Sequence, residues 1–397
     1  MNQFIKTAAL LAAAGLAAPA QAETSVSTDG GIKIKGDKAS FELDGRVQWD
    51  FALFDNDDRA TAGQNVSGSE FRRIRLAAKG KAYGWEYKIQ PDFADDGITM
   101  KDVYIATKLG FGKLTMGQFK MPFGLEELTS SKHITLQERS STSGVAASHQ
   151  MGVQLSNHFG AMSWAAAAYN LDDNDAEANN GTGFGARATF APVLDDVAVV
   201  HLGVAGALES YGNSTDGDNN RYRLRYRAAG HMSDASRPTL LDLNNGQRTD
   251  VTKLGFEAAG VMGPFSLQTE YALVDAEDNT EEGELTSYYL QASWVLTGER
   301  RGYKAKNGTF DKIKPQGANG AWELAVRMDV AEGQENPLGG ALTRDTEFEA
   351  LTLGVNWYVN PNTRITFNYI DAEITDQLTR AVIDQPSALT GRVQFAF

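Results

Sequence analysis

The sequence contains no cysteine, only ten prolines and fewer basic than acidic residues. Without a cysteine among 397 residues, disulfide frameworks, thiolate-ligated metal sites and thiol catalysis are excluded. The 37 Lys and Arg residues are outnumbered by 51 Asp and Glu residues, which gives a net charge of −14. Nucleic-acid binding draws its affinity from a basic surface that neutralises phosphates, so the composition argues against DNA or RNA as a partner.

The sequence also lacks any apolar run near the ~20 residues that a membrane-spanning helix needs. A shorter Ala- and Leu-rich run follows Lys6 and precedes the small residue Ala22. This pattern predicts a cleaved secretory signal peptide over residues 1–22, with a short N-terminal anchor helix as the alternative. We therefore expect an exported protein in which 23–38 form a short periplasmic segment and 39–397 form one domain.

Apolar and polar residues alternate along many segments, as in a strand with one apolar and one polar face. At the C-terminus, Val393, Phe395 and Phe397 share one face, and Arg392 and Gln394 share the other. A terminal Phe on such a strand resembles the signal that is read by the outer-membrane barrel assembly machinery. The same alternation recurs upstream throughout the chain.

Short connections such as 80–84 and 262–264 alternate with long polar ones such as 119–148 and 209–250. A soluble β-sandwich also has alternating strands, but outer-membrane barrels separate short periplasmic turns from long outer loops. We therefore predict an all-β fold, a transmembrane antiparallel β-barrel of about 16 strands. The predicted strands are 39–54, 69–79, 84–94, 98–109, 113–118, 149–158, 161–170, 182–191, 197–208, 251–261, 265–274, 285–296, 320–331, 347–358, 363–371 and 388–397.

A barrel of this size leaves an aqueous lumen, so the strand number predicts a pore. One connection on the periplasmic side, 297–319, is unusually long. Two predicted outer loops carry many acids and no Lys or Arg, and we interpret them as solvated loops facing lipopolysaccharide rather than as a specific cation site. Their acids are Asp172, Asp173, Asp175 and Glu177 in one loop and Asp275, Glu277, Asp278, Glu281, Glu282 and Glu284 in the other.

Four arginines recur at every second position in the motif RYRLRYR, within the long connection 209–250. In an extended segment their guanidinium groups would line one face at steps of ~6.6 Å. Such a row suits a ladder for anions, because like charges this close need a screening anion or water. An amphipathic edge strand with solvated arginines is the alternative. The four residues are Arg221, Arg223, Arg225 and Arg227.

Further cations occur at positions that alternation assigns to the lumen. Arg46, Arg73 and Arg75 have lumen parity, as do Lys88 and Asp92. Arg72 has the opposite parity and reaches the lumen only if its strand twists or bulges. The long turn 297–319 and the mature N-terminus add a basic cluster for collecting or releasing anions at the inner mouth, unless it is a plain solvated turn. The cluster comprises Lys33, Lys35, Lys38, Arg300, Arg301, Lys304, Lys306, Lys312 and Lys314.

Three segments resemble the phosphate-selective porin O and P family of outer-membrane channels: FELDGRVQWD (41–50), EFRRIRLAAKGKAYGWEYKIQPDFA (70–94) and GKLTMGQFKMPFGLEELTSSKHITLQERS (112–140). The resemblance implies a trimeric, sixteen-stranded barrel in which long loops and one periplasmic turn fold into the lumen. It implies passive diffusion of phosphate or polyphosphate, with the RYRLRYR arginines above a constriction and the basic turn below. The implied constriction residues, with Arg75 added by its lumen parity, are Arg46, Arg72, Arg73, Arg75, Asp92, Lys120 and Arg139. Lys120 is expected on the loop after the fifth strand.

Other functions are less well supported by the sequence. Its five histidines are scattered, and no metal-ligand spacing, nucleophile motif or phosphate-binding loop occurs, so we expect no enzyme, metal or cofactor. A general, unselective porin is the main alternative, and a structural or adhesin barrel is a third. The expected partners are phosphate or polyphosphate as permeant, outer-membrane lipid, two further copies of the chain in a homotrimer, and the barrel assembly machinery.

Overall fold

The computed structural model describes residues 25–28, 31–56, 63–94, 97–171, 181–212, 222–243 and 248–397. The predicted signal peptide, Arg221 and the acidic residues between Asp172 and Glu177 lie outside the described residues. Within the described ranges, no helix is long and apolar enough to cross a membrane.

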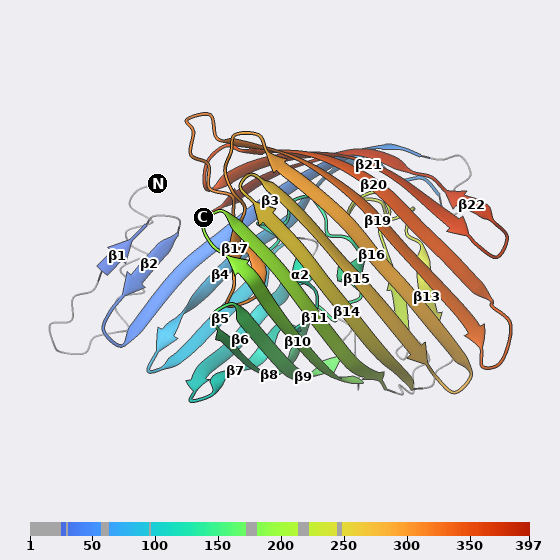
Figure 1. Ribbon diagram of the computed structural model, residues 1–397, viewed down its shortest axis with the longest axis horizontal. Helices are drawn as coiled ribbons and strands as arrows, with labels where there is room; N and C mark the ends of the chain where they lie inside the picture. The colour runs from blue at the N-terminus through green and yellow to red at the C-terminus, as the bar shows by residue number, and fades with distance from the viewer. Residues whose placement is uncertain are drawn as a thin grey trace.

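Sixteen antiparallel strands in the described part of the chain form a closed barrel, which confirms the predicted fold (Figure 1). The ring closes where β23 (Ser387–Ala396) pairs with β3 (Ala39–Asp55). The other strands are β4 (Gly68–Ala82), β5 (Trp85–Asp92), β6 (Thr99–Leu109), β7 (Gly112–Lys120), β8 (His149–Phe159), β9 (Met162–Leu171), β10 (Gly181–Leu194), β11 (Ala198–Tyr211), β14 (Thr249–Met262), β15 (Phe265–Glu277), β16 (Glu281–Val295), β19 (Ala321–Pro337), β20 (Arg344–Tyr358) and β21 (Thr363–Asp376).

Alternation along each strand separates an apolar outer surface from a polar lumen. On β20, Leu351 and Leu353 are exposed to the outside, whereas Thr352 and Asn356 are buried inside. A soluble protein buries its large apolar residues, so this inverted arrangement fits a hydrocarbon environment. Because the ring is closed, each of the sixteen described wall strands pairs with a neighbour on both sides, so its backbone polar groups can be satisfied within the sheet.

The two ends of the barrel differ in the length of their connections. Turns such as 83–84 and 263–264 lie at one end, together with the start of β3 and the end of β23, and long loops such as 121–148 lie at the other. The acidic connection is shorter than predicted, because β15 and β16 continue to Glu277 and from Glu281. Asp275, Glu277, Glu281, Glu282 and Glu284 therefore lie on strands and not in a loop.

Two short strands extend the wall at the short-turn end. β2 (Ile32–Lys35) pairs with the first residues of β3, and β1 (Ser25–Ser27) pairs with β2. A further strand, β22 (Ala381–Asp384), pairs with β21 at the long-loop end. The described part of the predicted N-terminal segment is therefore a continuation of the barrel sheet.

Three connections fold into the lumen and form the core of the molecule. Residues 121–148 carry α2 (Leu125–Leu128) and a 3-10 turn (Ser141–Gly144). The 212–248 connection carries the hairpin of β12 (Tyr222–Arg225) and β13 (Thr239–Leu243), and 296–320 carry that of β17 (Gly302–Lys304) and β18 (Thr309–Asp311). Their apolar side chains pack against small and apolar residues of the inner wall.

Candidate functional site

The segment 121–148 crosses the lumen because strands around the barrel hold it. Gly124 has a φ of 77°, a left-handed turn that suits glycine, and it redirects the chain from β7 into α2. The amides of Leu125 and Glu126 donate to Glu270 of β15 at 2.7 and 2.9 Å. Farther along, the amide of Ser141 donates to Asp329 of β19 at 3.0 Å. The segment is therefore fixed at several points, which keeps the lumen narrow and its geometry defined.

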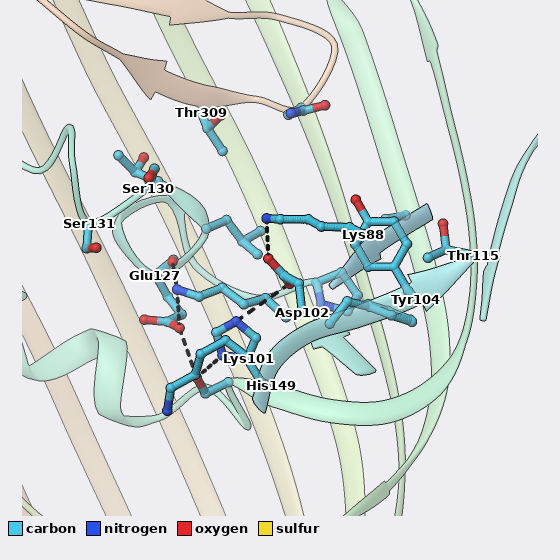
Figure 2. A pocket seen from close by; sticks show the side chains of 18 of the residues that line it. Lys88, Lys101, Asp102, Tyr104, Thr115, Glu127, Ser130, Ser131, His149 and Thr309 are labelled. Carbon is cyan, nitrogen blue, oxygen red and sulfur yellow. Dashed lines mark hydrogen bonds and ion pairs between the residues drawn. The ribbon is translucent and has the colours of Figure 1, made fainter. Parts of the chain in front are cut away.

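A central cavity of 630 Å³ lies between this segment and the wall β3–β10. Figure 2 shows side chains from β5, β6 and β7 pointing into it opposite Glu127, Ser130 and Ser131. Among the described residues, two carboxylates, Asp102 and Glu127, line it, against eleven basic side chains. The basic residues are Arg46, Arg72, Arg73, Arg75, Lys88, Lys101, Lys113, Lys120, Arg139, Arg187 and Lys306.

Six of the seven residues predicted for the constriction line this cavity. The exception is Asp92, which lies behind the lining and contacts Arg75 at 2.6 Å. Lys120 is the last residue of β7, not part of the following loop, because β7 is longer than predicted and pairs Lys120 with His149. Lys306 belongs to the turn 296–320 but reaches the central cavity.

Two β-bulges bring additional cations to the lumen. Along β4, Arg73 pairs with Gln48 and Phe71 pairs with Trp49, so that Arg72 is the extra residue. A bulge places consecutive side chains on the same face. Arg72 therefore joins Arg73 in the lumen. Its parity alone points outward, and the bulge is what brings it inside.

The second bulge lies on β6. Gln90 pairs with Asp102 and Pro91 pairs with Met100, so that Lys101 is the extra residue and lines the cavity beside Asp102. Simple alternation gives Lys101 the parity of the outward-facing Ile105, so its place in the lumen could not be predicted from alternation. In both strands the residue inserted by the bulge is basic.

Several of the lining cations already have a carboxylate partner. Lys88 contacts Asp102 at 2.5 Å, and Lys120 and Arg139 contact Glu127 at 2.6 and 3.2 Å. Burial alone would raise the pKa of Glu127, but Lys120 and Arg139 outweigh that effect and lower the pKa to about 2. These pairs hold the lysines and arginines in place and reduce the local positive charge.

Other cations have no such partner. Within the described residues, Arg46 and Lys101 lie beyond ion-pair distance of every carboxylate. Arg46 instead donates to the hydroxyls of Ser131 and Ser130 at 2.7 and 3.3 Å. Burial and the neighbouring Arg46 lower the pKa of Lys132 to about 8. The centre of the lumen therefore carries positive charge that the described chain does not neutralise.

A second cavity, of 310 Å³, lies on the long-loop side and shares Arg72, Arg73 and Arg139 with the central cavity. Arg225 and Arg227 of the RYRLRYR motif also line it. Two carboxylates and seven arginines of the part of the chain that the structure describes line it. Its other charged lining residues are Glu138, Arg237, Arg327 and Asp329, and His231 also lines it.

The motif itself is only partly extended. Tyr222 and Leu224 are buried against the wall and Arg223 is exposed, as a period of two predicts. The strand ends at Arg225, however, so the straight row expected of the arginines is not formed. Arg223 contacts Asp242 at 3.8 Å, and Arg227 contacts Asp234 at 2.8 Å.

A third cavity, of 660 Å³, lies at the short-turn end, and only some residues of the predicted basic cluster line it. Lys33, Lys304 and Lys312 line it, as does Arg301. Arg301 is largely structural, because it stacks on Phe310 at 3.8 Å and donates to Gln268 of β15 at 3.0 Å. The members of the cluster that line none of the three cavities are Lys35, Lys38, Arg300 and Lys314.

Phe397 lies at the seam of the barrel. Its amide donates to the carbonyl of Gly45 at 3.1 Å, and its ring packs near Phe395. It also lines the third cavity. Phe397 thus adds one more contact to the seam between the last and first strands.

Sequence reasoning missed several cations of the three cavities. Those on strands, such as Arg187, Arg327 and Arg364, have lumen parity next to outward apolar residues, and this signal could have identified them. Those on loops have no such period. The missed residues are Lys79, Lys101, Lys113, Lys132, Arg187, Arg237, Arg327 and Arg364.

The chain is similar to porins in sequence. A family model described as phosphate-selective porin O and P matches residues 41–397. Porin O of Pseudomonas aeruginosa is 33% identical over 409 residues, which cover 95% of this chain and 93% of that protein. An uncharacterized protein of Caulobacter vibrioides is 26% identical over 374 residues, covering 89% of this chain and 72% of that protein.

The fold is also similar to those of solved outer-membrane barrels. An anion-selective porin from Comamonas acidovorans has a TM-score of 0.53 at 12% identity, covering 91% of this chain and all of that one. OmpT of Vibrio cholerae, solved in a trimer form, has a TM-score of 0.54 at 12% identity, with 91% and 100% covered. At these identities the likeness concerns the fold alone.

Proposed function

Because the chain belongs to the phosphate-selective porin O and P family, we propose that it is a passive outer-membrane channel for phosphate or polyphosphate. Porins are channels of the outer membrane and not enzymes. One observation carries the proposal: the described residues of the central cavity include eleven basic side chains against two carboxylates, in a chain whose net charge is −14. Such a lumen attracts anions and repels cations.

The three cavities suggest a route for the anion. Arg225 and Arg227 would receive it from the outside, and Arg72, Arg73 and Arg139 would pass it to the central cavity that they also line. Guanidinium groups match phosphate oxygens two at a time, which favours phosphate over a spherical anion. A series of comparable sites allows stepwise movement without an energy source.

Within the central cavity, different residues would have different roles. Arg46 and Lys101 supply charge that the described carboxylates do not neutralise, and the Ser131 hydroxyl supplies a further polar contact. Asp92 holds Arg75 in position and moderates the attraction. Lys304 and Lys312 of the third cavity, at the short-turn end, would draw the anion toward the periplasm.

The barrel wall supports assembly into a homotrimer. β5 has 8 residues and β7 has 9, whereas β3 and β19 have 17. A tilted strand needs about 9–11 residues to cross the hydrocarbon core. The part of the wall around the short strands β5 and β7 is therefore the part best covered by further copies of the chain. We expect residues 1–22 to be removed on export, 23–38 to face the periplasm, and Phe397 to contact the barrel assembly machinery.

Single-channel current in a planar bilayer, measured in chloride and titrated with phosphate, tests the proposal. A phosphate site predicts that phosphate blocks the chloride current in a saturable manner, because a bound phosphate occupies the route. A general porin would show no saturable block. An adhesin or structural barrel would conduct poorly at every salt concentration.

A further inference from the structure

Glu138 lines the second cavity, beside the arginines that this cavity shares with the central cavity. Its Oε1 atom is 3.0 Å from Nε of Arg72, and its Oε2 atom is 3.2 Å from Nη2 of Arg72 and 3.8 Å from Nη2 of Arg73. Both arginines line both cavities, so any anion that passes from one cavity to the other meets them. A carboxylate of the chain therefore occupies the position that a passing anion would take.

Glu138 has a further partner that lies away from the route. Nη2 of Arg392 on β23 donates to its Oε1 at 2.6 Å. Arg392 is fixed by Asp50 of β3, whose two oxygens accept from it at 2.7 and 2.6 Å, and it lines neither cavity. If Arg72 and Arg73 turned to another anion, Glu138 would still be paired with Arg392.

Glu138 also remains charged. Burial alone would raise its pKa, but Arg72, Arg73 and Arg392 hold the pKa well below its ordinary range. The chain thus keeps a permanent negative charge at the junction of two strongly basic cavities. A purely attractive site would hold a multivalent anion too long to conduct, because conduction requires release as well as binding.

Building on the proposed function, we propose that Glu138 is a tethered counter-ion. It pairs with Arg72 and Arg73 when the junction is empty, yields them to a passing anion while it keeps Arg392, and pairs with them again as the anion leaves. Its competition weakens anion binding at the junction and speeds release. Glu138 thereby sets how tightly the pore holds its permeant.

The substitution Glu138→Gln tests this role, because it removes the charge and keeps the shape. We expect the phosphate concentration that half-blocks the chloride current to fall about tenfold. This corresponds to about 1.4 kcal/mol of binding free energy that competition from the Glu138 carboxylate takes away in the wild type. The current at saturating phosphate should fall as well, since release becomes slower. A merely structural anchor would give the opposite sign, because a loosened loop binds phosphate more weakly.

Two further variants keep the test decisive. Glu349→Gln makes the same chemical change on the outer face of β20 and should leave the half-blocking concentration unchanged. Glu138→Asp keeps the charge on a shorter side chain, should give an intermediate value, and provides the comparison if Glu138→Gln does not form a barrel. If phosphate blocks the wild type but Glu138→Gln leaves the half-blocking concentration unchanged or raises it, the inference is wrong. Absence of block in the wild type would instead overturn the proposed function.

Discussion

At the scale of single residues, the cations of the central cavity fall into two groups. Arg75 and Lys120 each contact a carboxylate at 2.6 Å, whereas Arg46 and Lys101 have no carboxylate of the described residues within ion-pair distance. The paired cations shape the route, and the unpaired ones provide its attraction. An anion near Arg46 and Lys101 gains charge-assisted hydrogen bonds for which no carboxylate of the described residues competes.

Replacing Lys101 with Met should therefore weaken phosphate binding. We expect the half-blocking phosphate concentration to rise about tenfold, the equivalent of one charge-assisted hydrogen bond of about 1.5 kcal/mol. The measurement is phosphate block of chloride current in a planar bilayer. Lys81→Met is the matched control, because Lys81 lies on the short-turn rim with 64% of its side chain exposed and should have no effect. Equal effects of the two substitutions would contradict a specific role for Lys101.

Lys132 should make the conductance depend on pH. Burial and Arg46 lower its pKa from the ordinary 10.5 to about 8, so the ammonium is charged at pH 7 and largely neutral at pH 9. We expect anion conductance at dilute salt to fall between these two pH values, with a midpoint near 8. In Lys132→Arg the group stays charged throughout this range, and the component of the fall with a midpoint near 8 should disappear. A fall that persists in Lys132→Arg would assign the pH dependence to another group.

At the scale of elements, alternation accounted for the strands and for most lumen residues on them. Arg46, Arg73 and Arg75 have lumen parity in the sequence and line the cavity in the structure. The two bulges were not predictable, because a bulge depends on register with the neighbouring strand and leaves no period in its own sequence. Arg72 could therefore be predicted only conditionally, and Lys101 was missed.

The inserted segments show the same limit more strongly. Lys132 and Lys306 lie in connections without a repeating pattern, and their places follow from contacts made over long sequence distances. Arg364, for example, donates to the carbonyl of Ile134 at 2.6 Å across 230 positions of the chain. A fully extended RYRLRYR segment would continue through Arg227, but pairing with β13 ends at Arg225.

The hairpin β17–β18 depends on a buried ion pair. Arg187 donates to the carbonyls of Asn307 and Gly308 at 3.0 and 2.8 Å and pairs with Glu257 of β14 at 2.6 Å. Arg187→Leu should destabilise the barrel by about 3–5 kcal/mol, because it leaves the Glu257 charge buried without its guanidinium partner. Urea-induced unfolding in detergent micelles would measure the loss.

The double variant Arg187→Leu, Glu257→Leu separates the ion pair from packing. Replacing both partners by apolar residues removes the unpaired charge, so we expect most of the lost stability to return. If the double variant is less stable than Arg187→Leu alone, the cost arises from lost packing and not from the unpaired carboxylate.

At the scale of the whole molecule, the net charge of −14 conceals a separation of charge. Acidic residues such as Asp275 and Glu284 lie directly opposite each other on the outer face of β15 and β16, near the long-loop end and away from the lumen. Basic residues dominate the cavities of the lumen. The composition argues against a nucleic-acid partner and says nothing about which small ions cross the pore.

The zero-current potential of the purified protein in a planar bilayer, under a potassium chloride gradient, tests the central claim most directly. A lumen with eleven basic side chains in its central cavity predicts a potential displaced toward the chloride equilibrium potential, in spite of the acidic exterior. A potential displaced toward the potassium equilibrium potential would contradict the account.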